Sequence, residues 1–136
     1  MSVRVLIADD DPAIRRLLRR LIETHPDWTV CADVPDGHEA VDKAMKLHPD
    51  VAVLDLAMPE MNGFQAAREI SQRNPNLPML LFTVQHVSKE LNNQAQNAGF
   101  RGALSKNTGG EVVHAIEVLL NRQNFFESIP NDAAVW

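Results

Sequence analysis

Short apolar runs alternate along this chain with longer segments whose apolar residues recur every three or four positions. Continuous apolar runs are typical of strands buried on both faces of a sheet. The predicted strands are Val3–Ala8, Trp28–Val34, Val51–Leu54, Met79–Phe82 and Phe100–Ser105. The three-to-four spacing predicts helices over 12–25, 40–48, 64–73, 88–98 and 112–120. Strands that alternate with helices predict an α/β fold, a doubly wound five-stranded parallel sheet with five helices.

Local signals mark where two of these helices begin or end. Asp11-Pro12 should open the first helix, because Asp caps helices and Pro suits the first helical position. Gly99 is the expected left-handed stop of the polar helix that precedes it. The apolar periodicity disappears after Arg122. We therefore expect one domain over residues 1–122, with 123–136 as a tail or the stub of a linker, and the pattern leaves open whether that tail is packed.

Four of the five apolar runs lead directly into polar residues that are unusual for a buried strand. Asp9, Asp10 and Asp11 follow the first run, and Asp55, Thr83 and Lys106 follow the third, fourth and fifth. Parallel strands bring their carboxyl ends to one edge of the sheet, where open α/β folds bind ligands. The sequence therefore predicts a pocket that contains several carboxylates, a hydroxyl and an ammonium group.

These residue types suit a divalent cation and a phosphoryl group. Carboxylates about 4 Å apart repel by roughly 4 kcal/mol per pair at an effective dielectric constant near 20, so a cation among them is expected. Oxygen ligands favour Mg²⁺ over zinc. Asp55 is the candidate nucleophile for an acyl phosphate, with Thr83 and Lys106 available to phosphoryl oxygens. The alternatives are an exposed acidic rim, a strand-end threonine and a solvated lysine.

Composition and charge narrow the function further. The chain has 136 residues and a net charge of -5, which argues against direct nucleic-acid binding. Four arginines (Arg15, Arg16, Arg19 and Arg20) are expected on a solvated helix face rather than on a nucleic-acid patch. The single Cys31 excludes an intramolecular disulfide. No apolar run is long enough to span a membrane, so a soluble, cytoplasmic protein is the expectation.

Four separated segments of the chain resemble the signature segments of response-regulator receiver domains. They are LIADDDPAIRRLL, VAVLDLAMPEMNGFQAAREI, PMLLFTVQ and AGFRGALSKN. The resemblance covers Val3 to about Arg122 and implies flavodoxin-like strand order 2-1-3-4-5. It implies that Asp55 is the phosphoacceptor, that Asp10 is the main Mg²⁺ ligand assisted by Asp9, and that the Ala57 carbonyl is a further ligand. Thr83 would be the switch hydroxyl and Lys106 the phosphate-pairing lysine.

The same resemblance implies partners. The phosphoryl donor would be a phosphohistidine on a sensor histidine kinase or a phosphotransfer protein. The segment GFRGALSK is most similar to receivers whose output domain is a helix-turn-helix, so a C-terminal output domain or a downstream protein is expected to read the switch. A phosphorylation-dependent homodimer is a further expectation.

Three positions depart from the family pattern. Ala103 stands three residues before the lysine, where receivers usually carry an aromatic ring that moves with the hydroxyl. Val84 is bulkier than the usual residue after the switch hydroxyl, and Asn107 replaces a common proline. We hypothesise that His86, just beyond Thr83, takes over part of the missing ring's role, against the alternative of an exposed loop histidine.

Other functions remain open. A pseudo-receiver that binds partners without phosphorylation is the main alternative, because Ala103 lacks the usual ring. A phosphohydrolase is disfavoured, since Ala57 stands where such enzymes often place an acid-base Asp. A flavin or nucleotide binder is disfavoured because the loop ADDDPA is acidic and contains no glycine. The prediction is therefore a signalling switch and not an enzyme.

Overall fold

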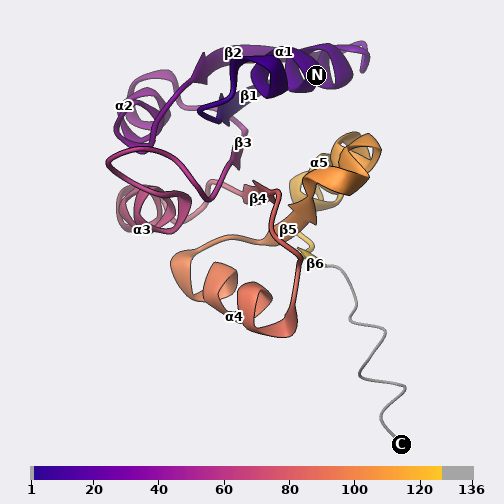
Figure 1. Ribbon diagram of the computed structural model, residues 1–136. Coiled ribbons are helices and arrows are strands. Elements are labelled where there is room, and N and C mark those ends of the chain that lie inside the picture. The colour runs from indigo at the N-terminus through magenta and orange to yellow at the C-terminus, as the bar shows by residue number, and fades with distance from the viewer. Residues whose placement is uncertain (1, 127–136) are drawn as a thin grey trace, which may run out of the picture.

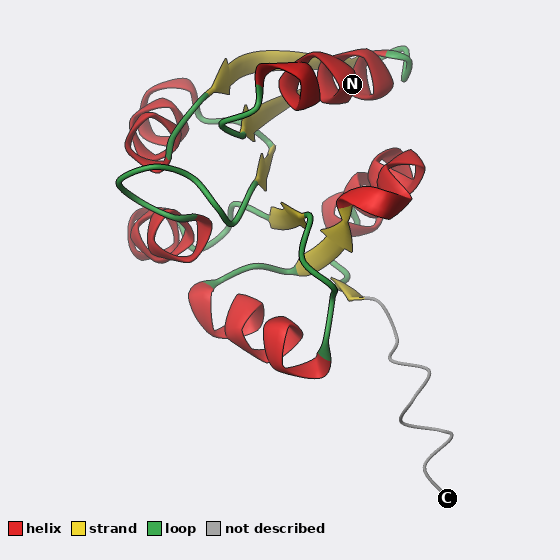
Figure 2. Cartoon of the chain, in the orientation of Figure 1, coloured by secondary structure: helices red, strands yellow, loops and turns green. Residues whose placement is uncertain are grey.

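The computed structural model describes residues 2–126, in which strands and helices alternate along the chain (Figure 2). The strands are β1 (Val3–Ala8), β2 (Trp28–Val34), β3 (Val51–Leu54), β4 (Met79–Thr83), β5 (Gly102–Ser105) and β6 (Phe125–Phe126). The α-helices are α1 (Pro12–Glu23), α2 (Gly37–Leu47), α3 (Gly63–Arg73), α4 (Lys89–Ala98) and α5 (Val112–Leu120). A 3-10 segment, η1 (Lys106–Glu111), precedes α5 and was not predicted.

All neighbouring strands of the sheet are parallel, in the order β2-β1-β3-β4-β5-β6. The predicted doubly wound fold and the order of its first five strands are confirmed. The predicted number of strands was wrong by one, because β6 extends the sheet beyond β5. Gly102 makes this pairing possible, since a Cβ on it would lie 2.7 Å from the Phe125 carbonyl oxygen.

The sheet is covered on both faces, which explains its continuous apolar strands (Figure 1). Along β1, Leu6 and Ala8 belong to the core beneath α2, α3 and α4. Val5 and Ile7 belong to the core beneath α1 and α5. Side chains alternate between the faces of a strand, so only an apolar residue at every position can fill both layers.

The predicted helix boundaries at Asp11 and Gly99 are confirmed. The Asp11 side chain accepts a hydrogen bond from the Ala13 amide at 2.9 Å, with Pro12 at the first helical position. Gly99 ends α4 with a φ of 109°, a left-handed conformation that favours glycine. Asp11 lies in the loop that leaves the carboxyl end of β1, whereas Gly99 lies in the loop that enters β5 at the opposite edge of the sheet.

Two further predictions concern the domain boundary near the C-terminus and membrane-spanning helices. The predicted domain boundary after residue 122 stays a prediction, and residues 127–136 of the predicted tail lie outside the described residues. Within residues 2–126, every helix is too short or too polar to cross a membrane.

Candidate functional site

The carboxyl ends of β1, β3, β4 and β5 bring the predicted site residues to one edge of the sheet. Asp9 and Asp55 directly follow β1 and β3, Thr83 ends β4, and Lys106 follows β5. The hydrogen-bond ladder between β1 and β3 continues into the site, since the Asp55 amide donates to the Ala8 carbonyl at 2.9 Å. The predicted convergence of these residues is therefore present in the fold.

Three carboxylates form an acidic cluster at this edge. One oxygen each of Asp9, Asp10 and Asp55 lie within 4.8 Å of one another. Asp9 is 1% exposed and Asp55 is 4% exposed, whereas Asp10 lies at the surface. Two buried carboxylates and a third open to solvent form an oxygen-only donor set that a hard cation could reach.

The Lys106 ammonium lies between the two buried carboxylates. Its Nζ is 2.7 Å from Asp9 Oδ2 and 3.5 Å from Asp55 Oδ2, and 5.9 Å from the centre of the Phe82 ring. Asp9 Oδ2 is buried, and among residues 2–126 the Lys106 ammonium is its polar partner. One ammonium group therefore faces three carboxylates, and the cluster keeps an excess of negative charge that a bound cation would reduce.

The pKa of Asp55 is raised from 3.8 to about 6. Burial of the carboxylate is the largest cause, followed by the Asp9 charge; Lys106 opposes the rise, and the Asp10 charge adds to it. A carboxylate with a pKa of about 6 is mostly ionised at neutral pH, yet it is more basic than an ordinary aspartate. Both properties suit a nucleophile.

Thr83 is buried, with 1% of the residue exposed. Its Oγ1 accepts a hydrogen bond from the Gln85 amide at 3.1 Å, so the hydroxyl still has its own hydrogen to donate. The β4–α4 loop that follows contains Val84, which is 69% exposed, and His86, which is also exposed. The proposed role of His86 as a replacement ring stays a prediction.

Gly63, at the start of α3, was missed as a residue that shapes the site. A Cβ on Gly63 would lie 2.3 Å from the Asp55 carbonyl oxygen. The Gly63 amide donates a hydrogen bond to the Leu56 carbonyl at 2.8 Å. The sequence signal is the Asn62 N-cap, which forms a capping box with Gln65 and opens the helix there. The missing side chain lets α3 begin directly against the backbone of Asp55.

Two departures from the receiver pattern have a local explanation. Asn107 donates its amide hydrogen to Ser105 Oγ at 3.1 Å, a bond that a proline could not make. Ala103 is fully buried and pairs with Phe126 of β6, whose side chain packs against the same core. An aromatic ring thus lies beside Ala103, but it comes from the neighbouring strand.

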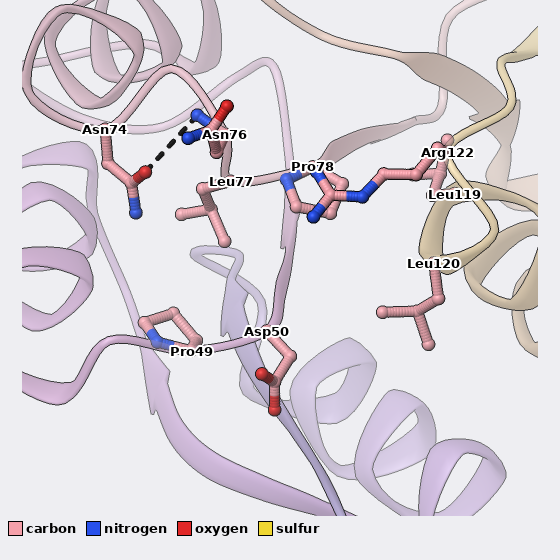
Figure 3. Close-up of a pocket in the computed structure, with 9 residues that line it drawn as sticks. All are labelled: Pro49, Asp50, Asn74, Asn76, Leu77, Pro78, Leu119, Leu120 and Arg122. Atoms are coloured by element: carbon pink, nitrogen blue, oxygen red, sulfur yellow. Dashed lines mark hydrogen bonds between the residues drawn. The ribbon is translucent and has the colours of Figure 1, made fainter.

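A cavity lies at the opposite edge of the sheet from the acidic cluster (Figure 3). It measures about 360 Å³ and lies between the loops that precede β3 and β4 and the end of α5. Its polar residues include Asp50, Asn74 and Arg122. None of the residues of the acidic cluster lines it.

Residues 5–117 match the sequence model of a protein family, the response regulator receiver domain. This chain belongs to the response regulator receiver domain family. A curated relative, the uncharacterized transcriptional regulatory protein YxjL of Bacillus subtilis, is 31% identical over 129 residues, which are 94% of this chain and 59% of the relative. A protein-glutamate methylesterase/protein-glutamine glutaminase of Alkalilimnicola ehrlichii is 43% identical over 83 residues, which are 61% of this chain and 21% of that protein.

Solved structures agree with the receiver assignment. A LuxR-family two-component response regulator from Aurantimonas sp. SI85-9A1 superposes with a TM-score of 0.88 at 32% identity, covering 98% of this chain and 94% of that chain. The receiver domain of the putative response regulator NarL from Mycobacterium tuberculosis gives a TM-score of 0.82 at 30% identity, covering 88% and 97%. This chain spans between about a fifth and three fifths of the first curated relatives it matches.

Proposed function

We propose that this receiver accepts a phosphoryl group on Asp55 and uses the modification as a switch. The observation that supports the proposal is the acidic cluster of Asp9, Asp10 and Asp55, whose oxygens lie within 4.8 Å, with the Lys106 ammonium 2.7 Å from one buried carboxylate and 3.5 Å from another. Phosphorylation-dependent switching is typical of the receiver family.

The donor we propose is a phosphohistidine on a sensor histidine kinase or a phosphotransfer protein. An ionised oxygen of Asp55 attacks phosphorus and forms a P–O bond, while the P–N bond to the donor imidazole breaks. The imidazole nitrogen keeps the electron pair and takes up a proton. The pKa of about 6 keeps most of Asp55 ionised at neutral pH for this attack.

We propose Mg²⁺ as the cofactor, held by the carboxylates of Asp9, Asp10 and Asp55 and by the Ala57 carbonyl. The fit rests on the oxygen-only donors and on their excess of negative charge. When bound, Mg²⁺ would neutralise charge on the carboxylates and on the phosphoryl oxygens. Ala57 is exposed in the loop after Asp55, and its role as a ligand is part of the proposal.

Lys106 and Thr83 respond to the added charge in this proposal. Lys106 already lies between Asp9 and Asp55, so a short movement of its ammonium can pair it with a phosphoryl oxygen. The Thr83 hydroxyl can turn its hydrogen to another phosphoryl oxygen, drawing in the β4–α4 loop. The changed loop would alter contacts with an output domain, a downstream protein or a second copy of the receiver.

The output itself is proposed from the relatives. Their names include transcriptional regulators and methylesterases, of which this chain matches only part. We propose that the chain acts as a cytoplasmic switch without an external substrate of its own, and that catalysis or DNA binding belongs to a partner or output domain.

The test is incubation with Mg²⁺ and acetyl phosphate, followed by intact mass measurement. We expect a gain of one phosphoryl group, about 80 Da, in the wild type and none in Asp55→Asn. Asp42→Asn is the matched control, because Asp42 forms an exposed pair with Lys46 on α2 and should not prevent the gain. A gain in Asp55→Asn would refute the assignment, and no gain in any protein would favour a pseudo-receiver.

A further inference from the structure

Arg15 on α1 reaches back to the end of β1. Its Nη1 donates to the Asp9 carbonyl oxygen at 2.7 Å, and its Nε lies 3.2 Å from Asp33 Oδ1 at the end of β2. The side chain is only 19% exposed. The expectation that Arg15 belongs to a solvated helix face was therefore wrong, because the polar side of α1 faces two strand ends at this position.

With the contact from Arg15, each of the four polar atoms of Asp9 has a partner. The Asp9 amide donates to the Val34 carbonyl at 3.0 Å, and Asp9 Oδ1 accepts from the Asp11 amide at 2.9 Å. Asp9 Oδ2 is ion-paired with Lys106 at 2.7 Å. The carbonyl oxygen is the fourth polar atom of the residue, and Arg15 holds it.

The hydrogen bond from Arg15 to the Asp9 carbonyl also restrains the backbone of Asp10. The Asp9 carbonyl and the Asp10 amide belong to one planar peptide unit, so fixing one fixes the other. Asp10 is at the surface, and no hydrogen bond or ion pair within residues 2–126 holds its side chain. The position of the Asp10 Cα, from which the carboxylate reaches the cluster, therefore depends on a peptide unit that Arg15 anchors.

Arg15 is itself held by its ion pair with Asp33. The other oxygen of Asp33 pairs with Arg19 Nη2 at 2.5 Å, and Arg19 also lies 3.6 Å from Glu23. Arg19 shares the ion-pair cluster but makes no contact with Asp9 among the described residues. The chain thus offers a matched pair of arginines, of which one contacts the acidic cluster and the other does not.

We propose that Arg15 is a positioning residue that preorganises the cation site through the Asp9–Asp10 peptide unit. This inference rests on the proposed function, because it assumes that Asp9 and Asp10 bind Mg²⁺. Removing a group that orients metal ligands typically weakens metal affinity by about 10- to 100-fold. Arg15→Gln is therefore expected to raise the Kd for Mg²⁺ by about tenfold or more, and Arg19→Gln to leave it within about twofold.

The experiment measures Mg²⁺ binding to each folded, metal-free variant by amide NMR titration, without phosphorylation. The Asp10 amide resonance of Arg15→Gln should already be displaced before Mg²⁺ is added, and that of Arg19→Gln should stay at the wild-type position. If Arg15→Gln does not fold, Arg15→Lys takes its place, because a single ammonium cannot reproduce both contacts of the guanidinium group.

The outcomes separate this inference from the function on which it rests. Equal Mg²⁺ affinities in the Arg15 and Arg19 variants, whether both wild-type or both weakened, would overturn the positioning role and leave the proposed function intact. A wild-type protein that binds no Mg²⁺ would overturn both.

Discussion

Replacing Asp55 with asparagine should stabilise the protein in the absence of metal, and the gain should depend on pH. The pKa of Asp55 is 3.8 when unperturbed and about 6 in the folded protein. Each pKa unit corresponds to about 1.4 kcal/mol, so ionised Asp55 disfavours the folded state by about 3 kcal/mol. The physical reason is that burial and the Asp9 charge outweigh the attraction of Lys106.

The raised pKa of Asp55 determines the pH range over which the wild type and Asp55→Asn differ in stability. Below pH 3.8 Asp55 is protonated in both states, so the wild type and Asp55→Asn should be similarly stable. As the pH rises from 3.8 to about 6, the unfolded chain loses its proton first, and the wild type loses stability relative to the variant. Above about pH 6 the advantage of Asp55→Asn should level off near 3 kcal/mol.

Urea unfolding in EDTA at a series of pH values from about 4 to about 8 measures this difference. Asp42→Asn is the control, because Asp42 forms an exposed pair with Lys46 on α2 and its loss should cost about 0.5 kcal/mol or less at every pH. A stability difference for Asp55→Asn that does not change with pH, or a variant less stable than the wild type at pH 8, would refute the reasoning.

Three further variants test other contacts of the site. Lys106→Met leaves a buried Asp9 oxygen without its ion-pair partner and should cost about 3 kcal/mol in urea unfolding without metal; an unchanged midpoint would count against the pair. Gly63→Ala should cost about 1–3 kcal/mol, whereas Gly110→Ala, with nothing within 4 Å of its Cβ, should cost far less; equal losses would contradict the close approach. Asp10→Asn should change stability little in EDTA but abolish most of the thermal stabilisation by Mg²⁺, and full stabilisation would argue against Asp10 as a ligand.

The strands and the acidic edge could be predicted because their signals are local. An apolar residue at every position marks a strand buried on both faces, and the polar residue that ends the strand must lie at the edge of the sheet. Asp9, Asp55, Thr83 and Lys106 were placed in this way, and the structure brings them together. The order of the strands came from the family resemblance, since periodicity alone does not specify which strands are neighbours.

The features that were missed depend on tertiary geometry. A strand of two residues has no periodicity, and β6 pairs with β5 only because Gly102 admits the Phe125 carbonyl. Arg15 lies on the polar side of an amphipathic helix, and the sequence does not tell which polar side chain turns back to a strand end. The Phe126 ring beside Ala103 is a further example, because it comes from β6, a strand that was not predicted.

The central claim is that the carboxylate of Asp55 becomes an acyl phosphate. Treating the protein with acetyl phosphate and Mg²⁺ and then with borohydride reduces an acyl phosphate to the alcohol, and peptide mass spectrometry locates the converted residue. We predict homoserine at position 55 and at no other aspartate. Conversion of Asp9 or Asp10 instead, or an unmodified Asp55 in protein that has gained a phosphoryl group, would contradict the account.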